Sequence, residues 1–88
     1  MKMSITNVPA ELETLKINEL YAVIRHDWQN IYFGAKPYLS AMFCLKDIDD
    51  MYGADSGRDI VAYFLANAQT WKGPVAKAVK AELKRRLT

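Results

Sequence analysis

The sequence is poor in the residues that disulfides and metal sites require. Its 88 residues include one cysteine, Cys44, and one histidine, His26. A single thiol cannot form an internal disulfide, and one histidine with one cysteine cannot supply the ligand set of a zinc site. We therefore expect Cys44 to be a small buried or half-buried hydrophobic residue and His26 to face solvent. No metal is expected.

Long apolar runs are absent as well. The longest covers residues 60–66, far short of the roughly 20 residues that a membrane-spanning helix needs. The first residues lack the apolar segment of a signal peptide. Together with the scarcity of cysteine, these features predict a cytoplasmic protein that does not associate with membranes.

No catalytic motif is visible. The glycines match no phosphate-binding loop, so no cofactor is expected, and the order around Ser56 is not Gly-x-Ser-x-Gly. The acidic residues between 47 and 59 fail the spacing of a calcium loop, because a loop starting at Asp47 has Arg58 at its twelfth position. Without a nucleophile, base and orienting group, we expect no enzyme activity.

What the chain does have is apolar and aromatic material. Hydrophobic residues make up 51% of it, with two tryptophans, five tyrosines and three phenylalanines. A chain of this length forms one domain and buries only about 60–65% of its unfolded surface, so its core is thin. Aromatic residues fill a small core efficiently, and they also suit a partner interface.

The apolar spacing predicts four helices. Apolar residues from Ile17 to Ile31 recur every three or four positions and predict a helix over 16–32. Pro37 starts a second helix that extends to about Tyr52. Ser56 is the expected N-cap of a third, which ends before Trp71. Pro74 opens a fourth, which continues towards the C-terminus.

No segment alternates with the period of a strand, so the sequence predicts no sheet. The expected fold class is all-α, with about four short helices in a compact bundle or an orthogonal array. Residues 1–14 carry no clear period and are expected to form an N-terminal arm, and residues 15–88 a single helical domain.

Charge is divided unevenly along the chain. Residues 72–88 contain six basic residues against Glu82 alone, a net charge of +5, whereas the other 71 residues carry −3. A basic helix face is typical of phosphate binding. The candidate nucleic-acid-binding residues are Lys72, Lys77, Lys80, Lys84 and Arg85. Cations in a last helical turn also stabilise the helix dipole, and Glu82 can pair with Arg86 four residues on, so this pattern has a purely structural interpretation too.

The acidic cluster holds two residues that need an explanation. Asp49 and Asp50 lie where the second helix should end, and acids there oppose the helix dipole. Solvated capping acids are one interpretation. A second is that this acidic corner meets the basic C-terminal helix, within one chain or between two.

Aromatic residues gather at the connector before Pro37. Tyr32, Phe33 and Tyr38 either close one end of the bundle or form an exposed recognition patch. On sequence alone the two interpretations are equally supported.

Several stretches resemble small uncharacterised proteins of bacterial and prophage genomes. They are residues 30–39 (NIYFGAKPYL), 52–58 (YGADSGR), 60–68 and 70–73. The resemblance begins at about residue 18, covers roughly four-fifths of the chain and implies a phage-associated accessory protein. Such proteins have no assigned activity, so it implies no functional residues.

These features lead to two ranked hypotheses. The first is a non-enzymatic protein–protein interaction module, with self-association left open, that uses Tyr32, Phe33 and Tyr38 with Asp49 and Asp50. The alternative is a phage-associated accessory protein that binds nucleic acid through its basic C-terminal helix.

Overall fold

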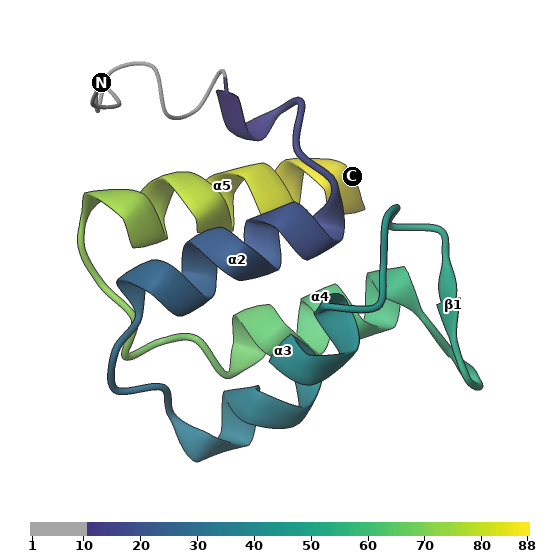
Figure 1. The fold of residues 1–88 in the computed structure, drawn as a ribbon, viewed down its shortest axis with the longest axis horizontal. Coiled ribbons are helices and arrows are strands. Elements are labelled where there is room, and N and C mark those ends of the chain that lie inside the picture. Colours follow the sequence, from purple (N-terminus) through teal and green to yellow (C-terminus); the bar gives the residue numbers. More distant parts are fainter. Residues whose placement is uncertain (1–10) are drawn as a thin grey trace.

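The computed structural model describes residues 11–88, which form a mostly helical domain (Figure 1). Four α-helices lie entirely within these residues: α2 (Ile17–Asp27), α3 (Lys36–Met42), α4 (Gly57–Ala66) and α5 (Pro74–Leu87). A short 3₁₀ helix, η2 (Phe33–Ala35), precedes α3, and the strands β1 (Met51–Tyr52) and β2 (Asp55–Ser56) form an antiparallel pair. The expected helical class is confirmed, whereas the all-α prediction is wrong at this hairpin.

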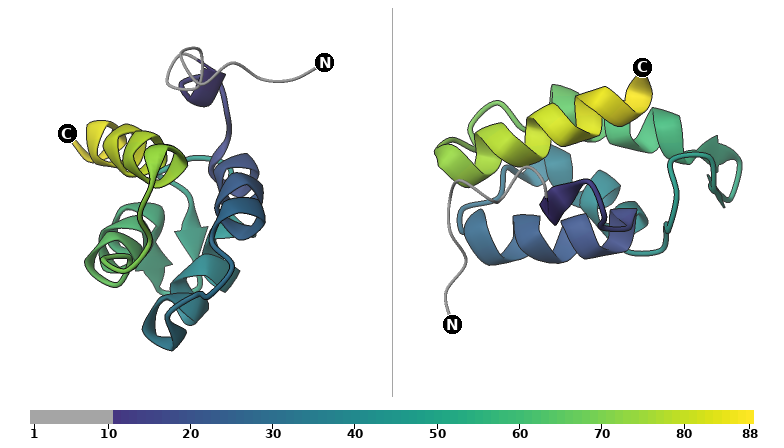
Figure 2. Two further views of the ribbon diagram at one scale, coloured as in Figure 1. Left: turned by 90° about the vertical axis from the view of Figure 1, so that its left-hand side faces the viewer. Right: turned by 90° about the horizontal axis from the view of Figure 1, so that it is seen from above.

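The helices surround one core. Helix α3 packs against α4, while α5 packs against both α2 and α4, and the left view of Figure 2 shows the four around a common centre. Trp28 and Trp71 stack there with ring centroids 5.7 Å apart, and Phe64 meets both edge-on. Asp27 Oδ2 accepts a hydrogen bond from Trp71 Nε1 at 2.8 Å. The indole is thus buried with its donor satisfied.

Helix α2 is shorter than predicted. It ends at Asp27 rather than near residue 32, yet Trp28 stays in the core from outside the helix. At the other end the backbone amides of Ile17 and Asn18 donate to the carbonyls of Lys46 and Leu45. A distant loop therefore satisfies amides that the start of a helix leaves free.

Helix α3 ends at Met42, so the prediction of a helix reaching Tyr52 is wrong. Asp50 Oδ2 accepts from the backbone amides of Lys46 and Asp47, each at 3.0 Å. Asp47 Oδ1 accepts from the amide of Asp49. These carboxylates offer the backbone an alternative to helical bonding, which explains why acids stand here.

The early end of α3 also corrects the expectation for Cys44. Cys44 is exposed rather than buried, in the turn that follows α3. Leu45 and Ile48 still reach the core from the loop. Apolar residues at helical spacing were thus buried without a helix.

A tight turn joins the two strands. Met51 pairs with Ser56 and Tyr52 with Asp55, which leaves Gly53 and Ala54 as a two-residue connection. Gly53 has φ +61°, which suits the first position of a type II′ hairpin turn. Strands of two residues are too short to show alternation, so the sequence pattern does not reveal them.

Helices α4 and α5 begin where predicted. Ser56 Oγ accepts from the amide of Asp59 at 3.1 Å, as an N-cap should. Pro74 is the first residue of α5, and Gly73 before it has φ +109°, a conformation open mainly to glycine. Gly57 is required for a different reason, since a Cβ there would lie 2.6 Å from the carbonyl oxygen of Ile48.

The predicted N-terminal arm lies mostly outside the described residues. Residues 1–10 are not described, but Leu12 is only 3% exposed and belongs to the core. Its carbonyl accepts a hydrogen bond from Arg86 Nη2 at 2.7 Å. The segment around Leu12 is therefore attached to the end of α5.

Candidate functional site

An exposed set of aromatic residues covers the side formed by η2, α3 and α4. Tyr32 and Phe33 are 43% and 74% exposed, with ring centroids 5.0 Å apart. Tyr63 on α4 is 50% exposed and packs against the half-buried Tyr38 of α3, with ring centroids 5.4 Å apart. We call Tyr32, Phe33, Tyr38 and Tyr63 the aromatic surface.

Asn67 lies beside one residue of each pair. Its Nδ2 donates to the carbonyl of Tyr63 at 2.9 Å, and it lines a small hollow together with Tyr32. Gly34 allows the ring of Tyr32 to lie close to the backbone, because a Cβ at residue 34 would lie 2.5 Å from that ring. The aromatic residues of the connector are therefore solvent-facing rather than a plug of the bundle, apart from the half-buried Tyr38.

Tyr63 was missed in the sequence. The run of residues 60–66 is apolar around most of its helical circumference, a pattern that predicts the most buried helix of the fold. Only one side of α4 packs inward, through Ile60, Val61 and Phe64. An apolar residue on the outer side of such a helix was the available signal for an exposed surface.

The predicted acidic partner residues are engaged within the chain. Asp49 pairs with Arg58, whose Nε lies 2.9 Å from its Oδ1. Asp50 binds the backbone of its own loop, and the amides of Asp47 and Lys46 hold the pKa of its carboxyl below the ordinary value. Neither residue lies beside the aromatic surface through any contact described for residues 11–88. Loop stabilisation explains both acids.

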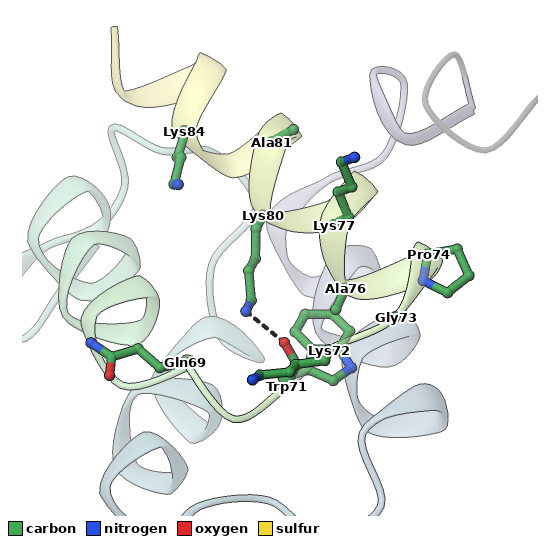
Figure 3. A pocket seen from close by; sticks show the side chains of 10 residues that line it. All are labelled: Gln69, Trp71, Lys72, Gly73, Pro74, Ala76, Lys77, Lys80, Ala81 and Lys84. Carbon is green, nitrogen blue, oxygen red and sulfur yellow. Dashed lines mark hydrogen bonds between the residues drawn. The ribbon is translucent and has the colours of Figure 1, made fainter.

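Four lysines line one open depression beside the start of α5. Lys72, Lys77, Lys80 and Lys84 share it with Gln69, Trp71, Gly73, Pro74, Ala76 and Ala81, around a volume of about 660 Å³ (Figure 3). No carboxylate from residues 11–88 is among these lining residues. Figure 3 shows Lys80 and Lys84 extending to the same side of α5, with Lys77 turned outward near Pro74. We call this site the lysine depression.

Lys80 is the most constrained of the four. Its Nζ donates to the carbonyl of Trp71 at 2.6 Å and lies 5.9 Å from the centre of the indole. Burial, followed by the charges of Lys84 and Lys72, lowers the pKa of its ammonium below the ordinary value. The depression therefore holds positive charges that repel one another.

Arg85, which the sequence groups with the four lysines, does not line the lysine depression. Its guanidinium forms two bonds to the carboxylate of Glu82, and Arg86 Nε lies 2.6 Å from the same carboxylate. The hydrogen bonds from Arg85 lower the pKa of Glu82, burial opposes this shift, and Arg86 adds to it. The structural interpretation of the last turn holds for both arginines.

The other candidate residues form no recognisable site. His26 is exposed as expected, and Ser56 Oγ is engaged as an N-cap. Residues 11–88 bring together no group of three His, Cys, Asp or Glu side chains that would hold a metal ion. Within the same range, every helix is too short or too polar to span a bilayer.

Comparison with known proteins adds no assignment. No protein-family model, curated protein or solved structure matches this chain.

Proposed function

We propose that this protein is a non-enzymatic helical module that binds another protein through its aromatic surface. The observation that carries the proposal is Phe33, which exposes 74% of its surface beside Tyr32. A soluble monomer gains nothing by holding several large aromatic rings together in water, whereas tyrosines and other aromatic residues are frequent energetic centres of interfaces.

The surface has the composition of an interface core. Three phenols and one phenyl ring provide apolar area with few flexible torsions, and the phenol hydroxyls provide polar edges. The two aromatic pairs lie on three elements that the core positions, so little ordering is required on binding. With Cys44 as the only thiol and no catalytic set in the sequence, we propose action in the cytoplasm without chemistry of its own.

A double variant tests the proposal. Phe33→Ser with Tyr63→Ser removes one ring from each pair, and loss of two interface aromatics weakens binding by about 30-fold or more. The matched control is Met51→Ser with Tyr52→Ser, which removes two exposed apolar side chains from the hairpin (62% and 44% exposed). Circular dichroism checks that both variants fold.

Two measurements read the outcome. Analytical ultracentrifugation over a concentration series detects self-association, and affinity purification followed by calorimetry with the purified partner detects a second protein. We expect one of these associations to be lost in the aromatic variant and kept in the hairpin variant. Equal binding by both variants would overturn the proposal.

A further inference from the structure

We infer that the lysine depression binds the phosphate backbone of double-stranded nucleic acid without reading its bases. This activity is separate from the proposed protein binding, since it uses other residues and another ligand. It extends the alternative that the charge pattern raised and changes the residues that carry it: Lys72, Lys77, Lys80 and Lys84 are retained and Arg85 is removed.

The first argument is uncompensated charge. The three ion pairs of residues 11–88 join Arg58 to Asp49, and Arg85 and Arg86 to Glu82. None of the four lysines of the depression has an ion pair in that part of the chain, and only the ammonium of Lys80 donates a hydrogen bond there, to a neutral carbonyl. A bound anion would relieve their mutual repulsion, which favours a ligand with several negative charges.

The second argument is spacing. Lys77 and Lys84 are seven residues apart on α5, which places them about 10.5 Å apart along the helix axis. Phosphates follow one another every 3.4 Å or so along the axis of each strand of a duplex. The lysines of α5 therefore extend over about the same length as three nucleotide steps, so they can contact successive phosphates of one strand.

The third argument separates duplex from single-stranded ligands. Proteins that bind single strands without sequence preference stack bases on exposed aromatic rings. The one aromatic ring that lines the depression is Trp71, which is 2% exposed, and its indole nitrogen is already bonded to Asp27. Lysines act as point charges on phosphates and do not form the planar fork that arginine offers to a guanine edge. The depression can thus hold a backbone but has no means of stacking or reading bases.

The salt dependence of binding tests this directly. Fluorescence anisotropy of a labelled 20-base-pair DNA duplex, the matching RNA duplex and the single-stranded DNA is followed from 25 to 200 mM salt. With three or four phosphate contacts, affinity for the duplex should fall about 40- to 150-fold between 50 and 200 mM. The DNA and RNA duplexes together identify which backbone is preferred, and binding of either supports the proposal.

A charge-matched pair of variants locates the site. Lys77→Gln with Lys84→Gln removes two exposed lysines from the depression, whereas Lys36→Gln with Lys46→Gln removes two exposed lysines that lie elsewhere. Lys80 is left intact because of its bond to Trp71. The first variant should reduce the slope of log affinity against log salt by about two, and the second should leave it nearly unchanged.

Several results would overturn the inference. They are no duplex binding at 25 mM salt, an equal loss in both variants, tighter binding of the single strand than of the duplex, or equally tight binding of polyglutamate. Vesicles containing 30% phosphatidylserine provide a further arm, and binding of vesicles without binding of duplex would assign the depression to membrane surfaces instead. The aromatic variant Phe33→Ser with Tyr63→Ser changes no charge and should keep the salt slope, so failure of either proposal leaves the other testable.

Discussion

The basic residues of α5 fall into two groups with different surroundings, although one helix of 14 residues carries them. In the last turn, Arg85 and Arg86 share Glu82, and Arg86 also holds the carbonyl of Leu12. The lysines at 77, 80 and 84 of the same helix have no ion pair within residues 11–88.

The position of one carboxylate explains the difference. At 100° per residue, Glu82 lies within about 60° of both arginines around the helix but about 140–160° from each of the three lysines. One acid therefore pairs with both cations of one face and leaves the other face without a counter-ion. The comparison teaches that net charge of a helix does not show which of its cations are free to bind a ligand, whereas the place of the counter-ion does.

The largest expected effect breaks the paired group. Glu82→Ala leaves Arg86, which is 14% exposed, without its counter-ion, and should lower the free energy of unfolding by about 3 kcal/mol. Urea denaturation measures it, with the exposed Glu11→Ala as control, which should change stability by less than about 0.5 kcal/mol. Equal effects of both variants would show that the paired group contributes nothing.

Acid titration should remove the same contribution gradually. The folded-state pKa of Glu82 lies below its ordinary value of 4.5, so the ion pair's stabilisation is complete above that pH and is lost as pH falls through the folded-state value. The difference in unfolding free energy between wild type and Glu82→Gln should therefore be constant from pH 7 to 5 and shrink below 4.5. Asp50 titrates in both proteins, so its effect cancels. A difference independent of pH would contradict the assignment.

Replacing Lys80 should have an effect on stability between those of the paired arginines and the free lysines. Lys80→Met keeps an apolar stem against Trp71 but removes the hydrogen bond to the carbonyl of Trp71. This should lower the free energy of unfolding, measured by urea denaturation, by about 1 kcal/mol. Lys84→Met is the matched control and should be nearly neutral. If both variants were neutral, Lys80 would be as unconstrained as its neighbours.

The smallest effect on stability is expected for the free lysines. Lys77→Gln with Lys84→Gln should change the free energy of unfolding by less than about 0.5 kcal/mol, because neither ammonium has a described partner. Thermal unfolding at low salt would show even a slight gain, since removing the charge of Lys84 reduces the repulsion of Lys80. A large loss of stability would mean that these lysines are structural, like the arginines.

Local signals identified α4 and α5 correctly. Ser56 with Asp59 marks the first start, and Pro74 marks the second. The apolar spacing along α2 also placed Ile17, Leu20 and Ile24 in the core. Each of these features depends on residues within one or two helical turns, so nearby sequence is enough to reveal it.

The candidate surfaces were predicted only in part. Composition and spacing single out Tyr32, Phe33 and the four lysines, which are exposed or line the lysine depression, but not Tyr63, because a helix apolar around most of its circumference indicates burial. Arg85 was grouped with the lysines because sequence counts charges without showing which carboxylate each one meets. For Asp49 and Asp50 the sequence left two interpretations, capping acids or residues that meet a basic partner, and the fold uses both acids within the chain.

The sequence by itself determined that the chain is mostly helical, where α4 and α5 begin, and which apolar stripe of α2 is buried, since hydrophobic period and caps act over a few residues. Only the tertiary structure decided the path of residues 43–56 and which basic side chains have an ion-pair partner. The loop carbonyls of Leu45 and Lys46 complete the start of α2, which lies nearly thirty residues earlier. Such bonds form between groups distant in sequence, so neither propensity nor spacing can reveal them.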